Sequence, residues 1–438
     1  MSVIVAVCPV PTDQVSGEVI SMKRNIRKTG SKWYQIMAQS LLVTSIVCTN
    51  LAYAGPNERN QAKRIHDRLT GTPPTNTMID TLEQRILNNG AEDAALFVIN
   101  NSPEFYNVTL KNFAAPWTNE AQDIFVPLND YSATVIGMIR DDMDFREVLY
   151  GNHLYVGQSV TPGYSNTNNN HYAALEALGS VAAGDLSDNS ILVRRTQTEI
   201  TGLPDPATAG VITTRAAAEA FFSGGTNRAM LRFTFMNYLC TDFEQLKDVS
   251  RIADHVRRDV TRSPGGDSRI FMNNCLGCHA GMDGLAGAFA YYEFNEDTGA
   301  LEYRDLSSNK FDANGVSLKH NINENNFKYG HITTDDSWIN YWRHGQNQLL
   351  GWSNDSAIML DEKFRSYGNG AKSLGYELAH TRAFSTCQVK KAFKAVCFRD
   401  SDNYAADRAQ VNTIANGFDT DGNMKNVFAK VAAYCKGP

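Results

Sequence analysis

The feature that most constrains this chain is a run of five residues, Cys275-Leu-Gly-Cys278-His279. C-x-x-C-H is the attachment signature of c-type haem. The two thiols add across the haem vinyl groups, and a gap of two residues brings both sulfur atoms to one edge of the porphyrin. The adjacent histidine then lies beneath the iron as its proximal ligand. The run therefore predicts one covalently bound haem c, attached through Cys275 and Cys278 with His279 on the iron.

Three other interpretations of this run have less support in the surrounding sequence. A thioredoxin-type dithiol lies in a βαβ unit, with a helix that begins at its first cysteine. The glycines here predict instead a loop between helical segments. A structural zinc site needs four ligands, and the sequence has no second C-x-x-C or H-x-H pair. A disulfide between Cys275 and Cys278 would be strained.

The first 54 residues have the organisation of a secretory signal peptide. A basic cluster at 23–32 precedes a mostly apolar stretch at 37–47, and an A-x-A tripeptide ends at Ala54. This order is typical of export, and the apolar run is too short to span a bilayer. We expect cleavage after Ala54, a true start at Met22 as an alternative to the first methionine, and a periplasmic or extracellular mature protein.

Charge and hydropathy limit the partners of the mature chain. The full chain has a formal net charge of −6, and removing residues 1–54 makes it more acidic, because that segment holds five basic and two acidic side chains. An acidic chain without a basic run is a poor candidate for nucleic acid or for an anionic membrane surface. No later stretch is long and apolar enough to cross a membrane. We therefore expect redox partner proteins, no nucleic acid and no membrane span.

Export also bears on the remaining cysteines, because thiols tend to pair in an oxidising compartment. With Cys275 and Cys278 assigned to haem, four cysteines remain in the mature chain, and three pairings of them exist. Our first choice joins Cys387 to Cys397 and Cys240 to Cys435, and the other two pairings stay open. The four candidates for disulfides are Cys240, Cys387, Cys397 and Cys435.

Helical periodicity and helix-ending residues dominate the organisation of the chain. Residues 57–115 predict a series of helices separated by glycine and proline, and two more are predicted at 376–397 and 422–435. A charged helix is predicted near 242–262. The stretch at 291–303, "YYEFNEDTGALEY", has the aromatic and turn residues of a short β-hairpin.

We therefore predict a mainly α fold with a small β-hairpin. The domain organisation that we expect is a signal peptide at 1–54, a helical domain of unknown role at 55–212, and a cytochrome c-like haem domain at 213–438. The second boundary falls after the loop-rich, Asn- and Gly-containing stretch that precedes it.

The distal side of the iron has several candidate ligands, which are Met359, His344 and His320. The segment "WRHGQNQLLGWSNDSAIML" resembles the distal loop of small class I cytochromes, but Leu350 stands where those proteins have the methionine. A missing distal ligand stays open, and it would leave a site for oxygen, peroxide or another small molecule. Arg343 is a candidate partner for a haem propionate.

The surroundings of the motif also resemble a family. "CLGCHAGMDGLAGAFAYYEF" is similar to the uncharacterised, cytochrome-associated proteins abundant in planctomycetes, in which the haem motif continues into a Met-Asp-Pro-Leu-Gly element. Met282, Asp283, Leu285 and Gly287 stand in similar places, and Gly284 replaces the proline. "RIHDRLTGTPPTNTMIDTLE" and "LAHTRAFSTCQVKKAFKAVCFRD" resemble other helices of the group. The resemblance implies an exported, mainly helical, haem-linked protein, and it implies no substrate.

Three functions follow from these observations. The first is an exported monohaem c-type cytochrome that passes single electrons between partner proteins, more a carrier than an enzyme. The second is a haem enzyme with an open distal site, of the peroxidase or oxygenase type. The third is a haem-free exported binding protein in which Cys275 and Cys278 are structural.

Overall fold

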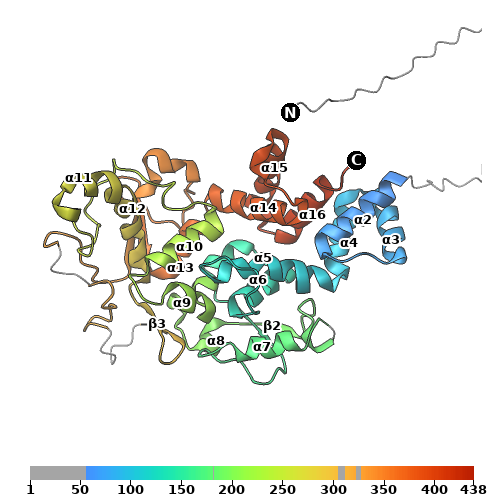
Figure 1. The fold of residues 1–438 in the computed structure, drawn as a ribbon, viewed down its shortest axis with the longest axis horizontal. Helices are drawn as coiled ribbons and strands as arrows, with labels where there is room; N and C mark the ends of the chain where they lie inside the picture. The colour runs from blue at the N-terminus through green and yellow to red at the C-terminus, as the bar shows by residue number, and fades with distance from the viewer. Residues whose placement is uncertain (1–55, 181, 304–310, 322–326) are drawn as a thin grey trace, which may run out of the picture. The chain divides into compact units, whose positions relative to one another are not determined.

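The structure is a computed structural model that describes residues 56–180, 182–303, 311–321 and 327–438. In these residues the chain is mainly helical, with three two-stranded antiparallel sheets (Figure 1). The predicted fold class is confirmed. The predicted signal peptide and its cleavage site after Ala54 lie outside the described residues.

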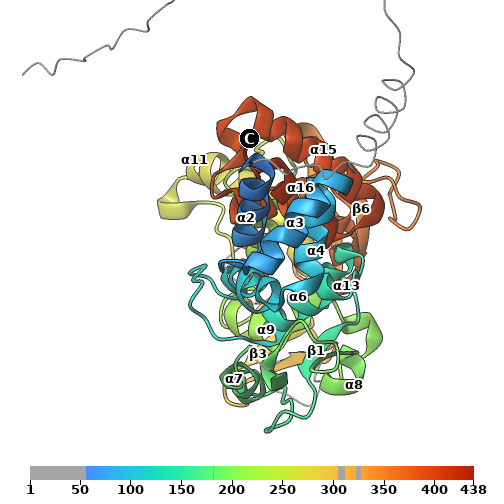
Figure 2. The same cartoon turned by 90° about the vertical axis from the view of Figure 1, so that its right-hand side faces the viewer.

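The first helices form where the sequence predicts them. They are α2 (Pro56–Thr70), α3 (Asn76–Asn89) and α4 (Ala91–Asn101), which contact one another (Figure 2). Thr75 caps α3 by accepting a hydrogen bond from the Met78 amide at 3.2 Å, which satisfies one of the free amides at a helix start. A π-helical turn (Phe105–Leu110) and the short α5 (Lys111–Ala114) follow.

The middle of the chain alternates short helices with two strands. Its elements are α6 (Asp130–Arg140), β1 (Leu154–Gly157), α7 (Asn170–Ala177), β2 (Leu192–Arg195), α8 (Gln197–Thr201), α9 (Arg215–Phe221) and α10 (Arg228–Leu239). α6 is buried along its whole length and contacts both strands. The carboxylate of Asp130 accepts hydrogen bonds from the first two amides of α9, at 2.6 and 3.0 Å, so it ties α6 to that helix.

The predicted β-hairpin is confirmed as β3 (Tyr292–Asn295) and β4 (Ala300–Tyr303), in which Tyr292 lies opposite Tyr303. β1 pairs with β2, and β5 (Ser337–Asn340) pairs with β6 (Ser366–Asn369). The partners in these last two sheets are far apart in sequence, so local pattern did not identify them.

Four helices form the C-terminal part, where two were predicted. They are α13 (Gly370–Ala379), α14 (Arg382–Cys397), α15 (Ala405–Asp421) and α16 (Met424–Tyr434). The predicted helix at 376–397 is divided because Thr381 has an extended backbone and caps α14. α16 packs against α4, which brings the C-terminal helices beside the N-terminal ones (Figure 1).

The region near 242–262 corrects the sequence prediction, because it forms turns and no helix. Its aspartates bind nearby amides: Asp248 Oδ1 accepts from the Ser250 amide at 2.9 Å, and Asp242 and Asp254 accept from the residues that follow them. Such local hydrogen bonds compete with the helical backbone pattern.

The described residues belong to one compact unit, in which core side chains from α2 to α16 pack together. The division between 55–212 and 213–438 stays a prediction. Within the described ranges, every helix is too short or too polar to cross a bilayer.

Candidate functional site

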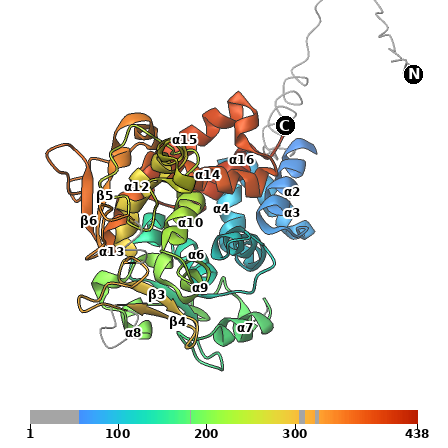
Figure 3. The same cartoon turned by 60° about the vertical axis from the view of Figure 1, so that its left-hand side comes forward.

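The cysteine pair lies on a helical segment, and the predicted loop at this point is wrong. α11 (Ser268–Ile270) continues through a π-helical turn (Phe271–Cys275) into α12 (Leu276–Ala286). Leu276 and Ala280, one turn apart, are buried in a small cluster with Val256 and Phe271. This apolar spacing favours a helix. Figure 3 shows α12 beside β5 and α10, both of which it contacts.

The glycines that suggested a loop are positions of close contact on the helix. A Cβ atom on Gly281 would overlap the indole ring of Trp342, and one on Gly284 would lie 2.9 Å from the carbonyl oxygen of Ile339 in β5. Glycine lowers helix propensity by about 1 kcal/mol relative to alanine. Here it allows α12 to pack closely against the β5 region, and the buried contacts compensate for that loss.

Helical geometry brings the three predicted haem residues to one side of the segment, because residues three and four apart share a face. Cys275, Cys278 and His279 are each partly exposed. Both cysteines are free thiols. In the part of the chain that the structure describes, every other cysteine is in a disulfide. Burial raises the pKa of the Cys278 thiol.

The disulfides correct the predicted pairing. Cys240 is bonded to Cys387, with Cα atoms 5.3 Å apart, and Cys397 to Cys435, with Cα atoms 5.6 Å apart. Cys387 and Cys397 both lie on α14. A helix rises 1.5 Å per residue, so ten residues separate them by roughly 15 Å, well beyond the reach of a disulfide. The prediction that these four cysteines form disulfides is confirmed, whereas the choice of partners is wrong.

The imidazole of His279 is oriented by a carboxylate one turn further along α12. His279 Nδ1 lies 3.3 Å from each carboxylate oxygen of Asp283. An ionised carboxylate only accepts hydrogen bonds, so Nδ1 is the donor in this contact, and Nε2 takes no part in it. A histidine held through one nitrogen, with the other available, is the arrangement found at metal-ligating histidines.

Asp283 is itself buried within a cluster of charges. Arg228 donates to its two oxygens at 2.7 and 3.1 Å, and the Arg257 amide donates at 3.1 Å. Arg228 also binds both oxygens of Asp259, at 2.7 and 2.9 Å. Burial alone would raise the pKa of Asp283, but the guanidinium groups of Arg228 and Arg257 hold it well below its usual range. Burial and the charge of Arg228 lower the pKa of Arg257 to about 10.

Exposed apolar side chains occur just before the motif and in a segment that is hydrogen-bonded to it. Met272, one turn before Cys275, is 51% exposed. The neighbouring segment at 243–252 is joined to the motif, because the Asp248 amide donates to the Gly277 carbonyl at 2.9 Å and Cys278 Sγ lies 3.5 Å from the Phe243 carbonyl. This segment exposes Val249 and Ile252 as well. Two free thiols and an oriented imidazole fit the chemistry of a covalently attached porphyrin.

The three distal candidates lie in different surroundings. His320 is buried, and its Nδ1 accepts from Arg257 at 2.7 Å. Since Arg257 also lies 3.8 Å from Asp283, His320 belongs to the cluster on the Nδ1 side of His279, which disfavours it as a ligand across the iron. Met359 is exposed and His344 Nε2 contacts the Lys363 carbonyl at 2.8 Å. Both stay predictions.

Arg343 does not have the role that the sequence suggested. Its guanidinium is buried and forms an ion pair with Glu377, with Nε–Oε1 and Nη2–Oε2 distances of 3.0 Å. Ser366 also binds Nε at 2.8 Å. With its donors engaged, Arg343 connects the β5–β6 sheet to α13 and is not free for a propionate.

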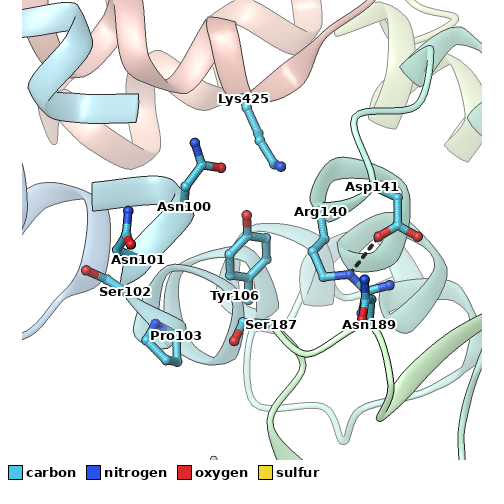
Figure 4. Close-up of a pocket in the computed structure, with 10 residues that line it drawn as sticks. All are labelled: Asn100, Asn101, Ser102, Pro103, Tyr106, Arg140, Asp141, Ser187, Asn189 and Lys425. Atoms are coloured by element: carbon cyan, nitrogen blue, oxygen red, sulfur yellow. Dashed lines mark hydrogen bonds and ion pairs between the residues drawn. The ribbon is translucent and has the colours of Figure 1, made fainter. Parts of the chain in front are cut away.

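A polar pocket of about 310 Å³ lies away from the motif, between the end of α4, the π-helical turn at 105–110, α6 and α16 (Figure 4). Tyr106 and Lys425 reach into it. Its two cations are already paired, Arg140 with Asp141 at 2.8 Å and Lys425 with Asp142 at 2.8 Å. This pocket offers no unpaired charge and shares no residue with the motif.

Sequence reasoning missed the charged groups around His279. Asp283 was noted only as part of the family resemblance, and Arg228 and Arg257 were not singled out. The available signal was the spacing of four between His279 and Asp283, which places the two on one face of a helix. A loop was predicted here, and in a loop a spacing of four residues does not bring two side chains to one face. The arginines come from distant segments, and the local pattern gives no sign of them.

No protein-family model, curated protein or solved structure matches this chain. Over the described residues, no group of three or more His, Cys, Asp or Glu side chains is placed to hold a metal ion. The fold class is therefore established from the structure alone, and the function rests on the site.

Proposed function

We propose that this chain is an exported c-type cytochrome that carries one covalent haem and transfers single electrons between partner proteins. The observation that carries the proposal is the state of the cysteines. Four of the six in the mature chain are joined in disulfides, and the two in C-x-x-C-H are free, on the same side of one helix as His279. The resemblance to planctomycete-type cytochrome-associated proteins supports the same class.

Each of the three residues has a defined task. Cys275 and Cys278 would hold the haem through one thioether bond each, formed by addition of each thiol S–H across one vinyl group. His279 would offer Nε2 to the iron, and its Nδ1 contacts the carboxylate of Asp283. A haem bound there would supply one-electron ferric/ferrous chemistry, with a potential set by the protein around it.

A haem enzyme with an open distal site is the second candidate. The contact of His320 with Arg257, in the cluster next to Asp283, favours the open-site enzyme. It disfavours one of the three candidate distal ligands. Small ligands such as carbon monoxide and cyanide bind an open position and change the absorption spectrum, whereas a filled position resists them. A spectrum that both ligands change points to the enzyme, and one that neither changes points to the carrier.

The attachment itself is tested with cysteine variants of the protein matured in a host that assembles c-type cytochromes. The wild type is expected to keep its haem after acid and organic-solvent extraction, and Cys275→Ala, Cys278→Ala is expected to release all of it. A matched double variant, Cys397→Ala, Cys435→Ala, removes two cysteines that the proposal assigns to a disulfide and should keep the haem. Loss of haem from this control alone, or no haem in the wild type, would contradict the proposal and favour a haem-free binding protein.

A further inference from the structure

We infer that Asp283 is a positioning residue that holds the imidazole of His279 by its Nδ1–H and lowers the reduction potential of the iron bound at Nε2. This inference rests on the proposed function. The bond is made within α12, between a histidine and a side chain one turn later, and both carboxylate oxygens lie at 3.3 Å from Nδ1. The acceptor is thus a charged side chain.

The type of acceptor matters because the proton on Nδ1 is shared with it. Hydrogen bonds to ionised acceptors are roughly twice as strong as neutral ones, and a carboxylate partner raises the basicity of a metal-bound histidine. A more basic imidazole donates more electron density at Nε2, which stabilises the ferric state relative to the ferrous state. A lower reduction potential follows.

The surrounding arginines keep this carboxylate in place without removing its effect. Arg228 binds Asp283 and Asp259 together, and Arg257 lies close by. Two cations thus face two carboxylates in the buried cluster, and of the two carboxylates only Asp283 contacts His279. Asp259 therefore serves as a control, because it binds the same Arg228 as Asp283 but does not contact His279.

A purely structural role for Asp283 would give a different result. In that case its carboxylate connects α12 to the segments that contain Arg228 and Arg257, as Asp259 does for Arg228. Removing either charge would then destabilise the fold to a similar extent and leave the iron unaffected. The reduction potential separates the two roles, since a structural connection does not change it.

The experiment compares Asp283→Asn and Asp259→Asn in the haem-loaded protein, after the covalent haem of each has been quantified. We expect Asp283→Asn to favour reduction at least tenfold, which for one electron is about 59 mV towards positive potential, and Asp259→Asn to change it less than threefold. Asp283→Glu keeps the charge and should shift the potential less than Asp283→Asn. Equal shifts in the two asparagine variants, or an unchanged potential in Asp283→Asn, would overturn the inference.

If Asp283→Asn does not fold, a resonance Raman measurement on the unmodified holoprotein tests the role of Asp283. The iron–imidazole stretching frequency in the resonance Raman spectrum of the reduced protein rises when the proximal histidine is bonded to a carboxylate. We expect it above that of a haem c whose histidine is bonded to a backbone carbonyl, and an equal frequency would refute the inference. A wild type with covalent haem and this equal frequency refutes Asp283 alone, whereas a wild type without haem refutes the proposed function and the inference with it.

Discussion

Replacing Gly281 by alanine tests how closely α12 packs against the β5 region, and therefore whether the site is built as described. The added methyl group would overlap the indole of Trp342, which is fully buried and has no room to turn away. Overpacking in a well-packed core costs about 1–3 kcal/mol, and a rigid aromatic ring places this case at the upper end. Alanine regains about 1 kcal/mol of helix propensity. We expect a net loss of about 2 kcal/mol in the free energy of unfolding.

Gly417→Ala is the matched control. Gly417 lies within α15, and a Cβ atom there meets only the flexible end of Lys430, at 3.3 Å from Nζ. No steric overlap then offsets the gain in helix propensity, and we expect the free energy of unfolding to rise by up to about 1 kcal/mol. The two variants make the same chemical change, so they should differ by about 3 kcal/mol.

Urea unfolding with the disulfides intact, followed by far-ultraviolet circular dichroism, measures both variants against the wild type. The slope with denaturant should be the same in all three, so that a change in midpoint reports stability. If Gly281→Ala is as stable as Gly417→Ala, then α12 does not approach Trp342 as described. In that case Gly281 is not a position of close contact.

The remaining predictions concern the disulfides and the pH dependence of stability. Digestion without reduction should yield Cys240 linked to Cys387 and Cys397 linked to Cys435, and a peptide pair joining Cys387 to Cys397 would contradict the fold of α14. Replacing both Cys240 and Cys387 by serine should cost about 4–5 kcal/mol, because the bond closes a loop of 147 residues, and denaturant unfolding measures this. Burial and the charges of Arg257 and Arg228 lower the pKa of His320 well below its ordinary value. The unfolded chain therefore binds the proton first, and stability should fall as the pH falls through about 6.5. His320→Gln should flatten that dependence, and an unchanged slope between about pH 7 and 5 would contradict the buried, neutral imidazole.

The helical class and the β-hairpin at 291–303 followed from periodicity and turn residues, which are local properties. The structural predictions that were wrong concern segments whose conformation the local sequence pattern did not determine. The glycines of α12 indicate a loop by composition, and only Trp342 and Ile339 on the other side of the contact explain them. Segment 242–262 has helical charge spacing, yet its aspartates bind their own neighbouring amides.

The candidate site likewise combines residues that local sequence spacing indicates with residues that only the fold brings together. Cys275, Cys278 and His279 are the residues that the sequence proposes for haem attachment, because that chemistry would fix their spacing. The acceptor for His279 lies four residues on, and it could be identified only once the segment was known to be helical. Arg228 and Arg257 come from other parts of the fold, so no spacing connects them to the motif. The disulfide partners likewise follow from where α10, α14 and α16 meet.

The intact mass of the mature protein under denaturing conditions shows whether the free cysteine pair on this helix attaches a haem. Denaturation removes any haem that is merely bound, so only a covalent one stays with the chain. We expect the mass of the processed polypeptide with two disulfides plus one haem, with the added mass on the peptide that contains Cys275 and Cys278. The mass of the polypeptide alone, with that peptide unmodified, would contradict it.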